Sequence, residues 1–286
     1  MPTPNAMPHA TSCRFTTSNG LTIHYLDWGN SQAQPMVLLH GIARTAHSFD
    51  HWALHLSDRY HLIAVDMRGH GESDWDPQGR YMVDDYYSDL AELIAHLHLK
   101  QIIVVGNSTG GRVAQLLAAR HPDRVQAALI EDVGPERPQA VSDRRAKRMS
   151  DEELGWAHSD LLLARLKNTY PRISDERLGA IITHGTRRDA EGRLFWRRDP
   201  AILGGFVATD LWQTISQIRT PILYVLGGAS DIVAPETQER LRRELPKVQI
   251  ITMPGLGHYP SDESTAAFMA IMDTFLSALP HARWGA

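Results

Sequence analysis

A serine flanked by glycines is the feature of this sequence that points most directly to chemistry. Gly106-Asn107-Ser108-Thr109-Gly110 fits the G-x-S-x-G pattern of a nucleophile elbow, in which a tight turn between a strand and a helix exposes a serine hydroxyl. Glycine on both sides removes side chains that would crowd such a turn. The amide groups that begin the following helix can stabilise an anion formed on a substrate. The motif predicts that Ser108 is a nucleophile.

A serine hydroxyl needs a neighbouring base before it can attack a carbonyl carbon. The chain has fifteen histidines, so the presence of one carries no information by itself. His258 is distinguished by its place, because it ends Gly255-Leu256-Gly257-His258, directly after an apolar segment and before a helical one. Such a loop lies at the carboxyl edge of an α/β sheet, where active sites gather. We therefore expect His258 to be the general base.

A third residue should hold the imidazole in one tautomer and stabilise its cation. Asp231 follows the apolar segment 221–226 through a short run of small residues. Its position matches the acid in the chain order Ser, Asp, His of this type of fold, and it is the favoured candidate. Glu131 and Asp132, which follow another apolar segment, remain alternatives for the acid. If they are not catalytic, their carboxylates would bond local backbone amides at the end of the strand.

The oxyanion of a tetrahedral intermediate needs two converging backbone N–H groups. The first is expected from Thr109, directly after the nucleophile. The second should come from the loop His40-Gly41-Ile42-Ala43, where Gly41 lets the backbone approach the substrate. Ile42 is the preferred donor and Ala43 the alternative.

A β-sheet must position these residues, and apolar segments of the sequence predict its strands. Short segments that are apolar on both faces are typical of central parallel strands covered by helices. They occur at 22–26, 36–39, 62–65, 102–105, 127–130, 221–226 and 248–253. Between them, 83–97, 112–120 and 264–279 have helical apolar spacing. This alternation predicts an α/β fold with a mostly parallel central sheet flanked by helices.

One region interrupts the alternation. From residue 136 to residue 205 the sequence has broken helical segments and many arginines but no good buried strand. We interpret it as a helical cap inserted into a core formed by 13–135 and 206–286. Residues 1–12 are expected to be a disordered tail.

Taken together, these motifs resemble the α/β-hydrolase superfamily. The resemblance rests on 38–41 (LLHG), 66–73 (DMRGHGES), 106–111 (GNSTGG), Asp231 and Gly257-His258, which occur in the order typical of the superfamily. It implies an eight-stranded core sheet, a Ser–Asp–His triad, and acyl transfer without a metal or organic cofactor. In such proteins the 66–73 loop has a mainly structural role.

The choice of reaction follows from the nucleophile type. Relatives with an aspartate at this position hydrolyse epoxides or haloalkanes, whereas a serine favours a small carboxylic ester or lactone as substrate. Gly-Asn-Ser is also similar to hydrolases that cleave carbon–carbon bonds in meta-cleavage products, but Tyr259 stands where those enzymes usually have tryptophan. Cofactor-free haloperoxidases, dioxygenases and non-catalytic ligand receptors on the same scaffold remain alternatives.

Three residues are candidates for contacting the substrate. Arg44, close to the expected oxyanion loop, could bind a substrate carboxylate through a bidentate guanidinium or could simply fix the loop. Trp156 and Trp196 could line an acyl pocket, although packing of the cap onto the core would account for them equally well.

The overall composition is that of an ordinary globular enzyme. A net charge of −4 argues against nucleic acid as the main partner, because such proteins usually carry a concentrated basic surface. The chain has one cysteine, Cys13, and no apolar segment near the ~20 residues of a membrane span. We therefore expect a cytoplasmic protein without internal disulfides.

Overall fold

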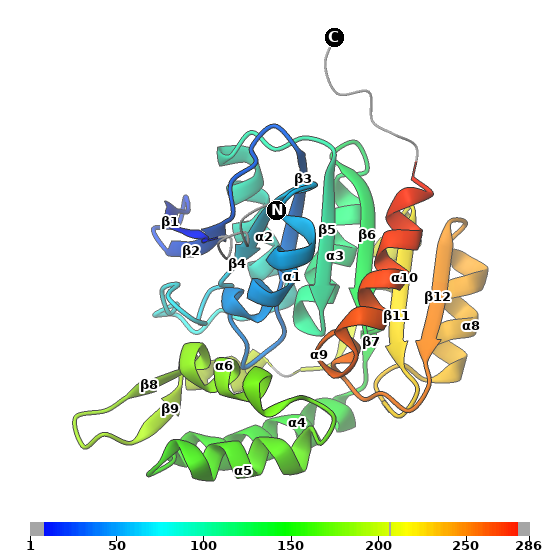
Figure 1. The fold of residues 1–286 in the computed structure, drawn as a ribbon. Coiled ribbons are helices and arrows are strands. Elements are labelled where there is room, and N and C mark those ends of the chain that lie inside the picture. The colour runs from blue at the N-terminus through cyan, green and yellow to red at the C-terminus, as the bar shows by residue number, and fades with distance from the viewer. Residues whose placement is uncertain (1–8, 206, 280–286) are drawn as a thin grey trace, which may run out of the picture.

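An eight-stranded mixed sheet forms the centre of the molecule (Figure 1). The computed structural model describes residues 9–205 and 207–279. The strand order is β1-β2-β4-β3-β5-β6-β11-β12, with β1, β2 and β4 paired antiparallel and the strands from β4 to β12 paired parallel. The strands are β1 (Thr11–Thr16), β2 (Thr22–Asp27), β3 (Gln34–Leu39), β4 (Tyr60–Val65), β5 (Ile102–Asn107), β6 (Val125–Glu131), β11 (Ile222–Gly227) and β12 (Val248–Met253).

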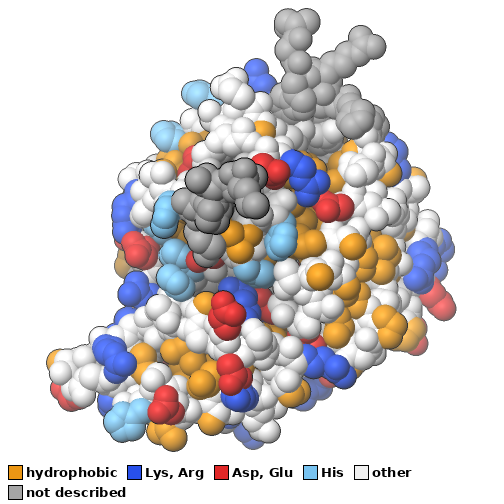
Figure 2. All heavy atoms as spheres, in the orientation of Figure 1, with side chains coloured by type: hydrophobic (Ala, Val, Ile, Leu, Met, Phe, Trp, Pro, Cys, Tyr) orange, Lys and Arg blue, Asp and Glu red, His pale blue; other side chains and the backbone are white. Residues whose placement is uncertain are grey.

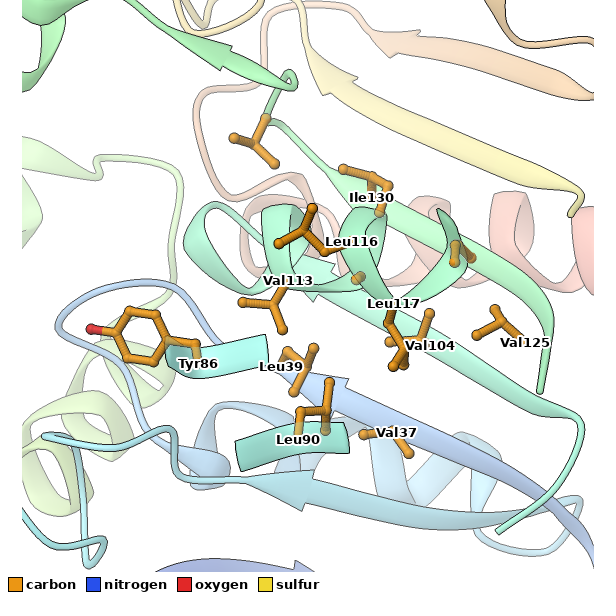
Figure 3. Close-up of a cluster of buried hydrophobic side chains, with 14 of the residues drawn as sticks. Val37, Leu39, Tyr86, Leu90, Val104, Val113, Leu116, Leu117, Val125 and Ile130 are labelled. Carbon is orange, nitrogen blue, oxygen red and sulfur yellow. The ribbon is translucent and has the colours of Figure 1, made fainter. Parts of the chain in front are cut away.

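Helices cover both faces of this sheet because its central strands are apolar on both sides. One face packs against α2 (Val83–His96), α3 (Thr109–Arg120), α7 (Trp212–Ile215) and α8 (Pro235–Glu244). Figure 3 shows part of this cluster, in which Val113 and Leu117 of α3 pack against Leu39 and Val104. The opposite face packs against α1 (Asp50–Leu56) and α10 (Thr265–Ser277). The helix α3, which begins directly after Ser108, is thus packed firmly on the sheet.

Each apolar segment identified in the sequence is a strand of this sheet, and the predicted α/β fold with a mostly parallel central sheet flanked by helices is confirmed. The N-terminal end differs from expectation. Thr11 and Ser12, assigned to the expected tail of residues 1–12, begin β1, because their backbone pairs antiparallel with Asp27 and Leu26 of β2. Residues 1–8 of that tail lie outside the described residues.

The segment between β6 and α7 leaves the sheet and forms a separate lobe next to the carboxyl ends of the strands (Figure 1). We call this lobe the cap. It consists of α4 (Gln139–Ser150), η2 (Asp151–Leu154), α5 (Ser159–Thr169), α6 (Asp175–Gly185), the hairpin of β8 (Thr186–Arg188) with β9 (Leu194–Trp196), and η3 (Pro200–Gly205). At its base, β7 (Glu136–Arg137) pairs with β10 (Thr209–Asp210).

The cap has its own apolar cluster, which brings residues of α5, α6 and β9 together with Tyr259 of the core. Histidine, basic and acidic side chains gather where the cap meets the core on the face shown in Figure 2. Within the described residues, no helix has both the length and the apolar character needed to cross a bilayer.

Candidate active site

Ser108 occupies a strained turn between β5 and α3. Its backbone has φ of 51° and ψ of −117°, a conformation that L-residues other than glycine rarely adopt. The neighbouring glycines make this turn possible: a Cβ added to Gly106 would lie 2.3 Å from the Gly110 carbonyl oxygen, and one added to Gly110 would lie 2.3 Å from that of Leu39. Strain retained at one position in a rigid scaffold is typical of functional sites.

The loop after β3 passes directly over this turn. A Cβ on Gly41 would lie 2.6 Å from Oδ1 of Asn107 and 3.1 Å from Cβ of Ser108, so a larger residue here would displace these side chains. His40 fixes the start of the loop, because its Nε2 accepts a hydrogen bond from the Met67 amide at 3.1 Å. The next residue, Ile42, borders the same cavity as Ser108.

The two expected oxyanion donors come from the helix after Ser108 and from the loop after β3. Thr109 is the first residue of α3, and the first N–H groups of a helix have no acceptor within it. Ile42 lies on the loop that covers the elbow. Ala43, the alternative donor, has a φ of 63° and lines the cavity beside Ile42.

His258 lies in the same cavity as Ser108 and is bonded to a buried carboxylate. Its Nδ1 is 2.7 Å from Oδ2 of Asp132, and the Asp132 side chain is only 1% exposed. Asp132 also accepts hydrogen bonds from the Gly227 amide at 2.9 Å and the Ser230 hydroxyl at 2.5 Å. The carboxylate is thus well fixed, and it holds the imidazole of His258 through Nδ1.

This geometry corrects the expected position of the acid. Asp231 is exposed and lines a different cavity, which His258 also borders, while Asp132 occupies the place beside Nδ1. The physical reason is visible in the loop after β11. Rather than placing Asp231 against the imidazole, this loop turns so that Ser230 donates to Asp132, which also accepts the amide of Gly227 at the end of β11. Asp132, at the end of β6, accommodates the turn with a φ of 46°.

Two residues that the sequence analysis did not identify fix the His258 loop. Glu263 accepts the amides on either side of the histidine, from Gly257 at 2.8 Å and from Tyr259 at 3.3 Å. Asn107, the residue before the nucleophile, donates from Nδ2 to the His258 carbonyl oxygen at 3.3 Å. The only sequence signal was the position of Asn107 next to Ser108.

Glu131, the other alternative for the acid, has a different environment. Its Oε1 accepts a hydrogen bond from the Ser261 amide at 2.7 Å. Complete burial raises the pKa of Glu131 to about 8, against the opposing effect of the bond from Ser261. It therefore stays mostly protonated at neutral pH, which spares Asp132 a second negative charge close by.

A cavity lies above Ser108, between the core and the cap. Core residues line one side and cap residues line the other, among them Met149, Leu166 and Ile181. Of the expected substrate-contacting residues, Arg44 and Trp196 border the cavity. Trp156 is not among its lining residues; it packs edge-on against Trp196, with ring centres 5.6 Å apart, and belongs to the apolar cluster of the cap.

Among the described residues, one trio has the composition of a metal site, but it lies away from Ser108. Ligand atoms of His47, Asp50 and His184 lie within 4.8 Å of one another. Nδ1 of His47 is bonded to Asp50 at 2.9 Å, and its ring stacks on that of His184 at 3.9 Å. An ion shared by two stacked rings would lie outside both ring planes, so this arrangement does not suit coordination.

Comparison with known proteins places the chain among hydrolases. A family model described as alpha/beta hydrolase fold matches residues 34–265. The chain is 28% identical over 246 residues to 2-(acetamidomethylene)succinate hydrolase of Mesorhizobium japonicum, covering 85% of this chain and 88% of that protein. It is 31% identical over 258 residues to 3-hydroxybutyrate-oligomer hydrolase of Cupriavidus necator, covering 83% and 87%. The crystal structure of E-2-(acetamidomethylene)succinate hydrolase matches with a TM-score of 0.86 at 27% identity, covering 94% of this chain and 100% of that one.

Proposed function

Because this chain belongs to the α/β-hydrolase family, we propose that it is a serine hydrolase that cleaves a small carboxylic ester or lactone through an acyl-enzyme. The observation that carries the proposal is the convergence of a strained serine and a histidine on one cavity, with a buried carboxylate behind the histidine. In this proposal Ser108 is the nucleophile, His258 the general base and Asp132 the orienting acid. Asp231 has no part in it.

In the first half-reaction, Oγ of Ser108 attacks the carbonyl carbon of the substrate while Nε2 of His258 takes its proton. Asp132 stabilises the imidazolium and holds its Nδ1–H in place through the 2.7 Å bond. Negative charge develops on the former carbonyl oxygen, where the backbone N–H groups of Ile42 and Thr109 stabilise it. The intermediate then collapses, and the imidazolium gives its proton to the departing alcohol oxygen.

In the second half-reaction, water replaces the alcohol. His258 removes a proton from a water molecule, which attacks the acyl carbon bound to Ser108. The same two N–H groups stabilise the second oxyanion, and the serine leaves with the proton from the imidazolium. For a lactone the leaving alcohol stays attached to the acyl chain, so the product is one hydroxy acid.

The proposal is tested with a panel of short aryl esters, lactones and one vinylogous carbon–carbon substrate of meta-cleavage type. We expect hydrolysis of at least one ester or lactone by the wild-type protein and a fall of about 10⁴-fold or more in kcat for Ser108→Ala. Cleavage of the carbon–carbon substrate alone would contradict the ester assignment. Ester hydrolysis that persists unchanged in Ser108→Ala would contradict the nucleophile.

A further inference from the structure

Arg44 is a buried cation that borders the catalytic cavity. Its side chain is 6% exposed, and its guanidinium carbon lies 4.2 Å from the centre of the Tyr259 ring and 5.8 Å from that of Tyr170. Neither Nη1 nor Nη2 makes a hydrogen bond of normal geometry within the described residues. A buried guanidinium with unsatisfied donors is costly, and these donors are therefore candidates for binding a ligand.

The charges behind Arg44 do not cancel. Asp262 is 2.7 Å from Nε of Arg177 and 3.2 Å from Nη2 of Arg44. Burial alone would raise the pKa of Asp262, but Arg177 and Arg44 hold that pKa below its ordinary value, so the carboxyl is ionised. Burial also lowers the pKa of the adjacent His51 to about 4, so this histidine is neutral at neutral pH. Two guanidinium groups thus share one carboxylate, and one positive charge is in excess.

Arg177 is the better neutralised of the two cations. It directs Nε to Asp262 and Nη2 to the Ser48 carbonyl oxygen. Both arginines border a small separate cavity, but Arg177 does not border the catalytic one. Arg44 meets the same carboxylate at a longer distance. The excess charge therefore belongs mainly to the guanidinium that borders the space above Ser108.

Two other charged groups border the catalytic cavity. Glu152 accepts hydrogen bonds from Nε1 of Trp196 at 3.0 Å and from Arg165 at 3.3 Å, so its charge is balanced within the cap. Arg145 is also a lining residue, and it makes interactions of its own within the protein. Nothing else among the lining residues carries a negative charge at neutral pH, so the cavity favours an anion.

We propose that Arg44 anchors a free carboxylate of the substrate, so that the enzyme acts on esters or lactones that carry this second, non-reacting group. The proposal rests on the proposed function, since it describes the substrate of the same site. A planar guanidinium matches a carboxylate through two parallel N–H···O bonds. Stacking on Tyr259 fixes the plane of the guanidinium, and this orientation would hold the substrate relative to Ser108.

The competing interpretation is that Arg44 only ties its loop to Asp262. The two interpretations are separated by substrates that differ in one charge. Mono-4-nitrophenyl adipate is compared with 4-nitrophenyl hexanoate for a carboxylate on the acyl side, and 4-acetoxybenzoate with phenyl acetate for one on the alcohol side. Both members of each pair are also measured for equilibrium binding to Ser108→Ala, which requires no turnover.

We expect the wild-type protein to prefer the anion in at least one pair by about tenfold or more in kcat/KM. Arg44→Gln should abolish this ratio, and Arg44→Lys should keep part of it because the charge is retained. Asp262→Asn should increase the ratio, because it removes the negative charge that competes with the substrate. The ratio is unaffected by a general loss of folded protein, so it reports on recognition.

Equal hydrolysis of both members of each pair would overturn the proposal. So would a preference that persists in Arg44→Gln, or one that disappears in Arg145→Gln but not in Arg44→Gln. Failure of the proposed function would look different: no ester would be turned over. In that case selective binding of the anions to Ser108→Ala, lost when Arg44→Gln is added, would still support Arg44 as a carboxylate anchor, and unselective binding would overturn it.

Discussion

At the scale of single residues, Asp132 holds His258 through a site built from three parts of the chain. It follows β6, it receives hydrogen bonds from the loop after β11, and it contacts a histidine that follows β12. Asp231, on the β11 loop itself, stays exposed. Two aspartates thus compete for one role in the sequence, and the folded geometry separates them.

We expect Asp132→Asn to lower kcat for ester hydrolysis by about 10⁴-fold, because the amide disfavours the required tautomer and no longer stabilises the imidazolium. Asp231→Asn is the matched control, since it makes the same chemical change nearby. It should stay within about threefold of wild type, as expected for a surface substitution. The opposite order of effects would return the acid role to Asp231.

A second prediction concerns Glu131 and the stability of the fold. Its pKa is about 8 in the folded protein, compared with an ordinary value near 4.5. Between these two values the folded state binds more protons than the unfolded state, so the contribution of Glu131 to stability falls as the pH rises through this window. Glu131→Gln removes this dependence and keeps an oxygen to accept the Ser261 amide.

The free energy of unfolding of Glu131→Gln should therefore rise relative to wild type, by up to about 1.4 kcal/mol for each pH unit inside the window. Urea unfolding of both proteins from about pH 5 to about pH 8 measures this difference. Glu236→Gln, on the exposed side of α8, controls for loss of a charge. A difference between Glu131→Gln and wild type that does not change with pH would contradict the assignment.

Sequence reasoning at this scale was limited to residues marked by local patterns. Ser108 stands in a motif whose glycines have a steric purpose, and His258 stands on a loop of small residues, so both could be proposed from the sequence. The acid has no such pattern. Choosing between Asp231 and Asp132 required knowing how the loop after β11 turns, which depends on tertiary hydrogen bonds. The roles of Glu263 and Arg44 depend on tertiary contacts in the same way.

At the scale of elements, the nucleophile turn depends on the close contact of β5, α3 and the end of β3. A Cβ on Gly110 would lie 2.3 Å from the backbone oxygen of Leu39. This clash can be relieved only if the backbone of β3 or of the elbow moves. We expect Gly110→Ala to displace the elbow, lowering kcat by about 100-fold or more, as a misplacement of about 1 Å in an active site can do.

The control for this substitution is Gly179→Ala in α6, where an added Cβ meets no atom within 4 Å. It should leave activity unchanged and stabilise the protein by up to about 1 kcal/mol, because alanine is the better helix former. Thermal unfolding and ester hydrolysis of the two variants measure both effects. Wild-type activity in Gly110→Ala would show that the elbow tolerates a side chain.

The elements of the core were largely predictable because buried parallel strands must be apolar on both faces, and these segments are conspicuous in the sequence. The strand β1 was not predicted. Its burial pattern is mostly exposed, since it lies at the sheet edge and pairs only with β2, so it lacks the apolar signal. The β8–β9 hairpin of the cap was not predicted either, because each of its strands has only three residues and is too short to give a periodic pattern.

At the scale of the whole molecule, the cap is attached to the core partly through buried polar contacts. The hydroxyl of Tyr81, on the core, donates to Oδ2 of Asp199 at 2.5 Å and accepts from the Asp76 amide at 2.8 Å. Asp199 follows the β8–β9 hairpin and its amide donates to the Gly69 carbonyl oxygen. This junction fixes the end of the cap beside the 66–73 loop.

We expect Tyr81→Phe to lower the free energy of unfolding by about 2 kcal/mol or more, because it leaves a buried carboxylate and a buried amide without this partner. Tyr87→Phe is the control. It removes a hydroxyl that bonds to His121 in a half-buried position, and it should cost below about 1 kcal/mol. Urea unfolding compares the two, and equal costs would mean that the cap junction does not depend on this contact.

The central claim is that the molecule assembles Ser108, His258 and Asp132 into one reactive unit. Covalent labelling with an alkyl fluorophosphonate tests it most directly, because only an activated serine reacts rapidly with this reagent. Intact mass and peptide mapping should show one phosphonyl group per wild-type chain, located on Ser108, and no comparable labelling of Ser108→Ala. Equal labelling of the two proteins, or labelling of another serine, would contradict the claim.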